Sequence, residues 1–223
     1  MKTDESLQAA VATRGFTLLF WAMMAWGAGV WTQEAWPTGW LRLVAAMAYV
    51  PLLGAGLWTV ERSMDPAVVK RGRVMAVPAT AAGVLTPYWV WWRAHPGVAA
   101  FAWTAAVLVA LWAAMVWAAA LLTRHCAVRL RDPVLRGEAS LTMLLLPALY
   151  AGAAWALWRL APEGAGWRAD VWMKTAAAAP PEFRLYVSAP MLLATCLLWN
   201  AKEAGWRRML EGPGGGDGKE EAE

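Results

Sequence analysis

Charged residues are scarce in this sequence, and none lies in the interior of its long apolar stretches. Of the 223 residues, 60% are hydrophobic and only 16% are charged, whereas a typical soluble domain has about 25% charged residues. Ionisable side chains within a membrane segment usually mark ion paths, proton relays or cofactor attachment. Their absence argues against a proton-coupled pump, a charged ion filter and a retinal-type Schiff base.

Histidine and cysteine are equally scarce, with two of each in the chain. His95 precedes the fourth apolar stretch and His125 follows it, so a haem held by both histidines is disfavoured. Cys126 is expected in a loop and Cys196 inside the last stretch, so we predict no disulfide between them. No metal site is expected, because His125 and Cys126 lack further ligands nearby in the sequence.

Motifs of catalysis and cofactor binding are absent as well. The sequence contains no nucleophile elbow, Walker loop or HExxH motif. We therefore expect no bound cofactor, and the sequence leans against an enzyme.

Six long uncharged apolar stretches divide the chain. About 20 helical residues span the hydrocarbon core of a bilayer, where every backbone N–H and C=O must be bonded within a helix or a closed barrel. The stretches are too long for barrel strands and do not alternate in polarity. We therefore predict an all-α integral membrane protein with six transmembrane helices. The stretches are Gly15–Gln33, Leu43–Val60, Val74–Trp92, Pro96–Thr123, Ala139–Trp158 and Leu185–Ala201.

Basic residues are divided unequally between the two sides of such a bundle. Fourteen of the 20 Lys and Arg residues fall in the tails and in the loops after the second and fourth stretches. Because cytoplasmic loops carry the excess of positive charge, the prediction is N-in and C-in, in a plasma membrane such as the bacterial inner membrane. The predicted parts are a cytoplasmic tail at 1–14, a transmembrane domain at 15–208 and a disordered, acidic, glycine-rich tail at 209–223.

Tryptophan, by contrast, is abundant, with 18 residues in the chain. Most of them, including Trp89 and Trp92, fall near the predicted outer interface, where an indole ring is buried and its N–H is wet. This pattern indicates an aromatic belt. The alternative is an aromatic-lined outer site for a flat or cationic ligand.

The long outer loop between the fifth and sixth spans, Arg159–Arg184, contains a mixture of apolar and charged residues. It predicts a short amphipathic element that lies in the outer interface and ends at the pair Pro180 and Pro181.

The two predicted cytoplasmic loops share the pattern R-x-x-D-P. In each loop the aspartate suits a helix N-cap and the proline suits the first helical position, because the carboxylate accepts orphan N–H groups and proline has none to lose. The alternative is a pair of equivalent contacts for a partner protein. The candidate cap or contact positions are Arg62, Asp65, Pro66, Arg129, Asp132 and Pro133.

Three functions fit these patterns. The first is a non-catalytic subunit or scaffold of a membrane complex, supported by the paired basic loops and by small residues that let helices pack closely. The second is a transporter of an apolar or amphipathic small molecule, because the layout of spans resembles that of ABC-2-type exporter permeases, although no motif of that family is present. The third is a membrane redox subunit that binds haem or quinone.

The expected partners are the lipid bilayer and either another membrane protein or a second copy of the chain. Nucleic acid is not expected, although the net charge is +4, because the basic residues lie in the short loops that set topology.

Overall fold

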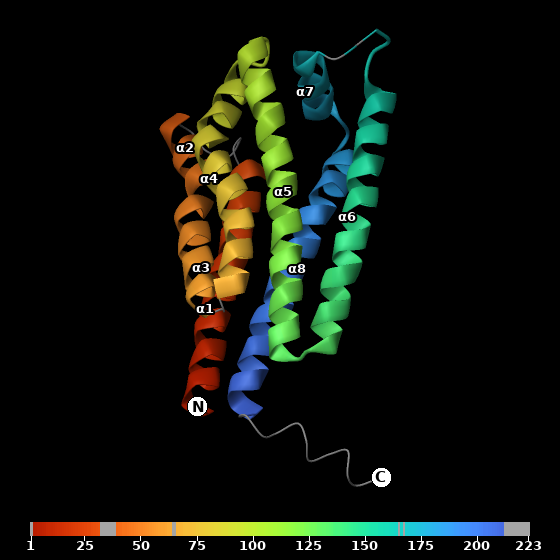
Figure 1. Cartoon of the computed structure of the whole chain (residues 1–223). Coiled ribbons are helices and arrows are strands. Elements are labelled where there is room, and N and C mark those ends of the chain that lie inside the picture. The colour runs from red at the N-terminus through yellow and green to blue at the C-terminus, as the bar shows by residue number, and fades with distance from the viewer. Residues whose placement is uncertain (1, 32–38, 64–65, 165, 167, 212–223) are drawn as a thin grey trace.

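A computed structural model describes residues 2–31, 39–63, 66–164, 166 and 168–211 of the chain. Within these ranges the chain forms eight α-helices and no strand. Most of them run up and down one elongated bundle (Figure 1). The helices are α1 (Lys2–Trp31), α2 (Gly39–Met47), α3 (Tyr49–Ser63), α4 (Pro66–Ala94), α5 (Ala99–Leu130), α6 (Pro133–Leu160), α7 (Ala169–Ala178) and α8 (Pro181–Glu211).

The two ends of the bundle differ in what they carry. Helix α1 begins and α8 ends at one end, which also holds the α5–α6 turn and which we name the terminal end (Figure 1). The α4–α5 turn and α7 lie at the opposite end, which we name the distal end. Helices overlap both predicted tails. Helix α1 starts at Lys2, within the tail predicted at 1–14, and α8 continues to Glu211, within the tail predicted at 209–223.

Four stretches of the described chain are long and apolar enough to cross a membrane, judged by length and composition. This agrees with the all-α architecture of a membrane protein predicted from the sequence. The stretches are Leu7–Gly29, Gly39–Val60, Ala99–Leu130 and Pro133–Leu160.

Helices continue beyond the apolar runs that revealed them. Helix α5 extends past the end of its run at Thr123 as far as Leu130. The loop position predicted for Cys126 is therefore wrong, because this residue is buried within α5. Hydropathy indicates which residues favour lipid. A helix ends where its last backbone carbonyl groups take hydrogen-bond partners outside the helical pattern.

A break separates α2 from α3 inside the second apolar stretch. Proline has no backbone N–H, and its ring clashes with the carbonyl of the residue four positions earlier. For Pro51 that residue is Met47, and Met47 is the last residue of α2. The chain turns at Ala48, whose N–H donates to the carbonyl of Ala45 at 3.4 Å. Pro51 thus accounts for a helix break rather than a mere kink.

Two glycines let α1 and α3 approach each other closely. A Cβ at Gly56 would lie 2.9 Å from the side chain of Leu19 and 3.0 Å from its backbone nitrogen. A Cβ at Gly15 would lie 2.9 Å from the backbone nitrogen of Val60. Leu19 and Val60 are buried there with Phe16. Small residues favour helix association where lipid is as apolar as the side chains.

Helix α7 occupies the long loop where the sequence predicts an amphipathic element. Its buried residues Ala169 and Met173 pack against Trp92, Ala102 and Ala105 at the distal ends of α4 and α5. The element therefore rests its apolar side on the protein, as a cap over this end of the bundle.

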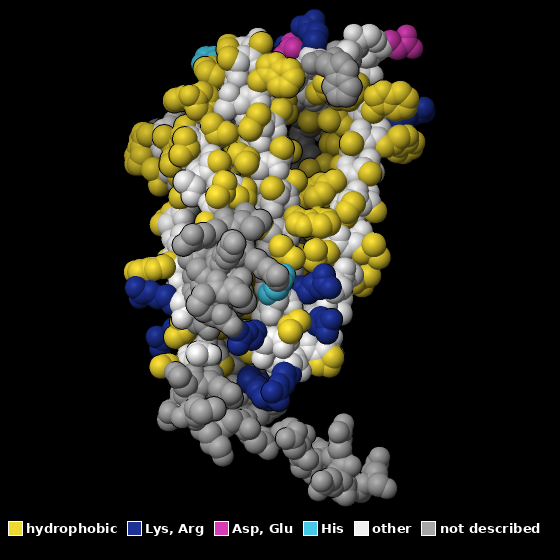
Figure 2. Space-filling view, in the orientation of Figure 1, with side chains coloured by type: hydrophobic (Ala, Val, Ile, Leu, Met, Phe, Trp, Pro, Cys, Tyr) yellow, Lys and Arg dark blue, Asp and Glu magenta, His cyan; other side chains and the backbone are white. Residues whose placement is uncertain are grey.

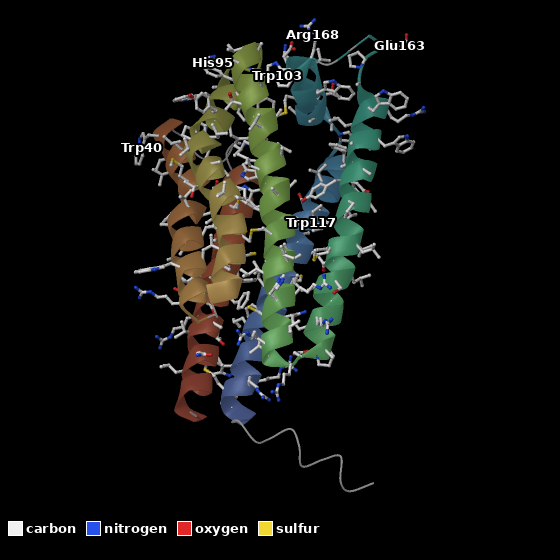
Figure 3. The ribbon with its side chains drawn as sticks, in the orientation of Figure 1. Trp40, His95, Trp103, Trp117, Glu163 and Arg168 are labelled. Atoms are coloured by element: carbon white, nitrogen blue, oxygen red, sulfur yellow. The ribbon has the colours of Figure 1, made fainter. Side chains whose placement is uncertain are left out.

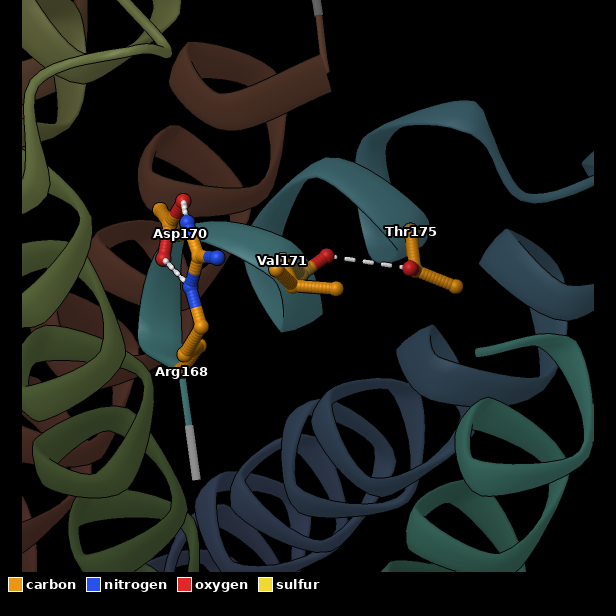
Figure 4. Close-up of polar contacts among 4 residues, drawn as sticks. All are labelled: Arg168, Asp170, Val171 and Thr175. Carbon is orange, nitrogen blue, oxygen red and sulfur yellow. Dashed lines mark hydrogen bonds and ion pairs between the residues drawn. The ribbon is translucent and has the colours of Figure 1, made fainter. Parts of the chain in front are cut away.

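Polar contacts support α7 at its start and along its length (Figure 4). The Arg168 guanidinium donates to the Asp170 carboxylate at 2.9 Å, and the Thr175 hydroxyl donates to the Val171 carbonyl at 3.0 Å. The bond from Arg168 holds the pKa of Asp170 below its ordinary value. The charged carboxylate then stays beside the helix N-terminus, where negative charge is favourable.

We expect Gly56→Ala to lower the thermal unfolding temperature of the detergent-solubilised protein. The new methyl group would meet the backbone of Leu19, and such overpacking costs about 1–3 kcal/mol. Gly54→Ala on the same helix is the matched control, because a Cβ there has nothing within 4 Å. This control should unfold at the same or a slightly higher temperature. An equal decrease in unfolding temperature in both variants would show that the α1–α3 contact does not depend on Gly56.

Candidate functional site

The turn between α5 and α6 contains an arginine in an unusual conformation. Arg131 has φ 52° and ψ 36°, in the left-handed region, and among the described residues it is the one non-glycine with a positive φ. The N–H of Asp132 donates to the Ala127 carbonyl at 3.0 Å, and that of Arg131 to the Val128 carbonyl at 3.3 Å. This pattern closes many helices, usually with glycine at the left-handed position.

The left-handed conformation has a cost for arginine. A side chain with a Cβ loses about 1–2 kcal/mol there relative to the right-handed region, whereas glycine adopts it freely. Strain held at one residue is a reason to ask what its side chain does.

Helix α6 begins directly after this arginine. Asp132 is its N-cap, and the carboxylate Oδ1 accepts from the N–H of Leu135 at 2.9 Å. Pro133 is the first helical residue. The second R-x-x-D-P loop therefore has the geometry of a proline-started, aspartate-capped helix.

Helix α8 contributes two polar contacts to this region. An Arg207 guanidinium nitrogen lies 4.0 Å from the Asp132 carboxylate, which makes a long and largely exposed ion pair of little energetic weight. The amide of Asn200 donates to the carboxylate of Glu138 at 2.9 Å. Sequence reasoning did not find these partners, because nothing in the local pattern of α6 indicates which helix lies beside it.

A hollow of about 500 Å³ opens at this turn. Arg131 and Arg136 are exposed, and Lys and Arg side chains gather around this end of the face shown in Figure 2. The site is therefore basic and lies at a turn closed by hydrogen bonds. Its lining includes Arg131, Asp132, Pro133, Arg136, Gly137 and Ser140.

The other predicted positions lie apart from this hollow or outside the described residues. Arg129 is exposed in the last turn of α5. Arg62 lies at the terminal end of α3, with its guanidinium carbon 3.9 Å from the centroid of the Trp58 ring. Pro66 is the first residue of α4, and Asp65 lies outside the described residues. The structure thus brings Arg129, Asp132 and Pro133 to one turn and places Arg62 on another helix.

A second region of interest is a cluster of four tryptophans from three helices. Trp112 of α5 contacts Trp26 of α1 with ring centroids 5.0 Å apart, and Trp89 of α4 at 5.1 Å. Trp89 also contacts Trp92 at 5.0 Å. Trp103 and Trp117, labelled in Figure 3 on the same helix as Trp112, are exposed instead.

The indole N–H groups of all four clustered tryptophans are buried, and the described residues offer them no hydrogen-bond partner. The prediction that the indole N–H groups of Trp89 and Trp92 are wet is therefore wrong. Trp92 is only 2% exposed, because α5 and α7 cover it. A buried donor without an acceptor costs about 1–3 kcal/mol.

Tyr49 and Thr86 form a hydrogen-bonded pair beside the tryptophan cluster. The Thr86 hydroxyl donates to the Ala82 carbonyl at 2.7 Å, so the Tyr49 hydroxyl donates to Thr86, at 2.9 Å. Trp112 lies next to the Tyr49 hydroxyl but lacks hydrogen-bond geometry to it. This side of the cluster is therefore polar although it is buried.

Among the residues that the structure describes, no three His, Cys, Asp or Glu side chains are grouped closely enough to hold a metal ion. His95 lies in the α4–α5 turn at the distal end (Figure 3), and the Nδ1 of His125 lies 2.7 Å from the Leu121 carbonyl within α5. The chain matches no family model, no curated protein and no solved structure.

Replacing Asp132 separates its role as a cap from its charge. Asp132→Ala should destabilise the protein by about 1 kcal/mol, because the Leu135 N–H loses its acceptor. Asp132→Asn keeps an acceptor oxygen, so its free energy of unfolding should stay within a few tenths of a kcal/mol of the wild-type value. Thermal unfolding in one detergent checks both variants. If Asn and Ala are equally harmful, the ion pair with Arg207 matters more than the cap.

Proposed function

We propose that the chain is a six-span plasma-membrane protein, with both termini cytoplasmic, that acts as a non-catalytic, partner-binding subunit of a membrane complex. The basic hollow at the α5–α6 turn is the proposed contact site. Support for the orientation comes from the terminal end, where α1 begins, α8 ends and exposed basic residues gather (Figures 1 and 2). Positive charge of this kind is retained on the cytoplasmic side.

The strained conformation of Arg131 carries this proposal. Glycine would close α5 without steric cost, so the strain at Arg131 supports a role for its side chain beyond the turn. A guanidinium pairs with carboxylates through two parallel hydrogen bonds and stays charged at every relevant pH. Arg136 adds a second exposed guanidinium to the same hollow. The proposed partner is an acidic segment of another membrane protein or of a second copy.

Arg131→Gly is the decisive variant, because it relaxes the backbone and removes the charge together. We expect its unfolding temperature to equal or exceed that of the wild type, while the partner is lost. The measurement is gentle detergent extraction of the tagged full chain at native abundance, followed by mass analysis of what co-purifies. A turn with only a structural role would gain stability and keep the partner.

Arg159→Gln is the control for this experiment, since Arg159 is an exposed arginine in the last turn of α6, far along the helix from the turn. It should retain the partner. A wild-type chain that runs as a lone monomer would contradict the subunit proposal. Reporters fused to the two termini test the orientation, and signals from opposite sides of the membrane would contradict six spans.

One specific observation favours a second candidate function. The four buried indole N–H groups without acceptors suit a flat, uncharged ligand with carbonyl oxygens, such as the quinone considered from the sequence. Indole rings offer stacking surfaces, and their N–H groups would bond the carbonyl oxygens. This second proposal is independent of the α5–α6 turn.

Trp112→Phe tests the second candidate, because it keeps an aromatic ring and removes one buried donor. A short-chain ubiquinone should raise the unfolding temperature of the wild type, and by mass action a ligand at 100 times its Kd adds about 2.7 kcal/mol. The variant should bind about tenfold more weakly. Trp117→Phe, at an exposed tryptophan of the same helix, should bind normally. No thermal shift in the wild type rules this candidate out.

A further inference from the structure

A groove runs between α3 and α4 on the outside of the bundle. Its volume is about 430 Å³, and its walls are almost entirely apolar. Small residues from both helices form much of the floor, including Gly54, Thr80 and Gly83. Met47 lies toward one end of the groove and Trp58 toward the other.

Gly54 is the most informative of these residues. A Cβ at Gly54 would meet nothing within 4 Å, whereas one at Gly56 would meet Leu19. Packing inside the chain therefore explains Gly56 and leaves Gly54 unexplained. A glycine within a helix costs about 1 kcal/mol relative to alanine. An occupant from outside the chain would account for the open space.

The length of the groove approaches the thickness of one leaflet of a bilayer. At a rise of about 1.5 Å per residue, the helical distance from Val50 to Trp58 within α3 is about 12 Å, and Met47 extends the groove beyond the break between α2 and α3. The hydrocarbon core of a bilayer is about 30 Å thick. The groove is therefore long enough to hold much of one acyl chain.

A cationic side chain lies beyond the Trp58 end of this groove. Arg62 is one helical turn further along α3, and its guanidinium carbon lies 3.9 Å from the centroid of the Trp58 ring. A guanidinium stacked on an indole still presents the N–H donors at its edge, and these suit phosphate.

We infer that this groove holds one acyl chain of an anionic phospholipid whose phosphate is bound by Arg62. The apolar walls and the opening at Gly54 accommodate the chain, and the basic end favours a headgroup of net negative charge. The proposed orientation makes it a lipid of the cytoplasmic leaflet. The assignment to the cytoplasmic leaflet rests on the proposed topology, whereas lipid binding itself depends on neither the partner nor the quinone.

The test is a lipid titration of the delipidated full chain, followed by native mass spectrometry. Phosphatidylglycerol and phosphatidylcholine with identical acyl chains compete at equal concentration. We expect the wild type to retain one phosphatidylglycerol in preference to phosphatidylcholine. Gly54→Leu fills the groove without a clash at its Cβ, and should reduce the bound lipid about tenfold. Ala55→Leu is the matched control, because Ala55 is exposed on the same helix outside the groove, and it should bind like the wild type.

Arg62→Gln separates the headgroup from the chain. It should abolish the preference for phosphatidylglycerol, since the loss of a charged hydrogen bond weakens binding about tenfold. Arg159→Gln should keep the preference. Unchanged lipid retention in Gly54→Leu overturns the inference, and so does equal binding of the two lipids by the wild type. If Gly54→Leu keeps its lipid but loses a co-purifying protein, the groove holds a partner helix and the lipid proposal is wrong.

Discussion

Close backbone contact between α1 and α3 is the constraint on which the bundle depends. Lipid tails are as apolar as leucine, so helices in a membrane associate through packing that lipid cannot match. Gly15 and Gly56 provide that packing, because neither position has room for a Cβ. The same helix α1 also receives α8, where Thr13 lies against Gly205. With α1 fixed between these two neighbours, Trp26 reaches Trp112 of α5 and joins the tryptophan cluster.

Helix α6 is attached in a different way. Only 11% of its apolar window is buried, compared with 50% for those of α1 and α5, so most of its apolar surface faces outward. Its terminal half packs Leu135, Ala139 and Leu146 into the core. Polar contacts support the same half, through the capped turn at Asp132 and the bond from Asn200 to Glu138. A surface that is both polar and loosely covered suits an exchangeable contact better than a permanent core.

Features that depend on a few neighbouring residues in the sequence could be predicted. Features that depend on which helices lie side by side could not. The break at Pro51, the start of α6 at Pro133 and the helix before Pro180 follow from rules that act within a few residues. Hydropathy misplaced Cys126, because an apolar run ends where lipid contact ends and a helix continues as long as its hydrogen bonds can. The burial of Trp92 depends on α7, which lies far away in the sequence. The partners that α8 supplies to the candidate site, Asn200 and Arg207, have no local signal at all.

The shortness of the α5–α6 turn has a consequence for biogenesis. Helix α5 ends at Leu130 and α6 begins at Pro133, so the two helices form a hairpin with a very short turn. In the proposed orientation this hairpin would insert as one unit, with its basic turn staying on the side of synthesis while the apolar arms cross together. The backbone of Arg131 would then be fixed early, before α8 has been made. Assembly of the last helix would complete a site whose most strained residue is already in place.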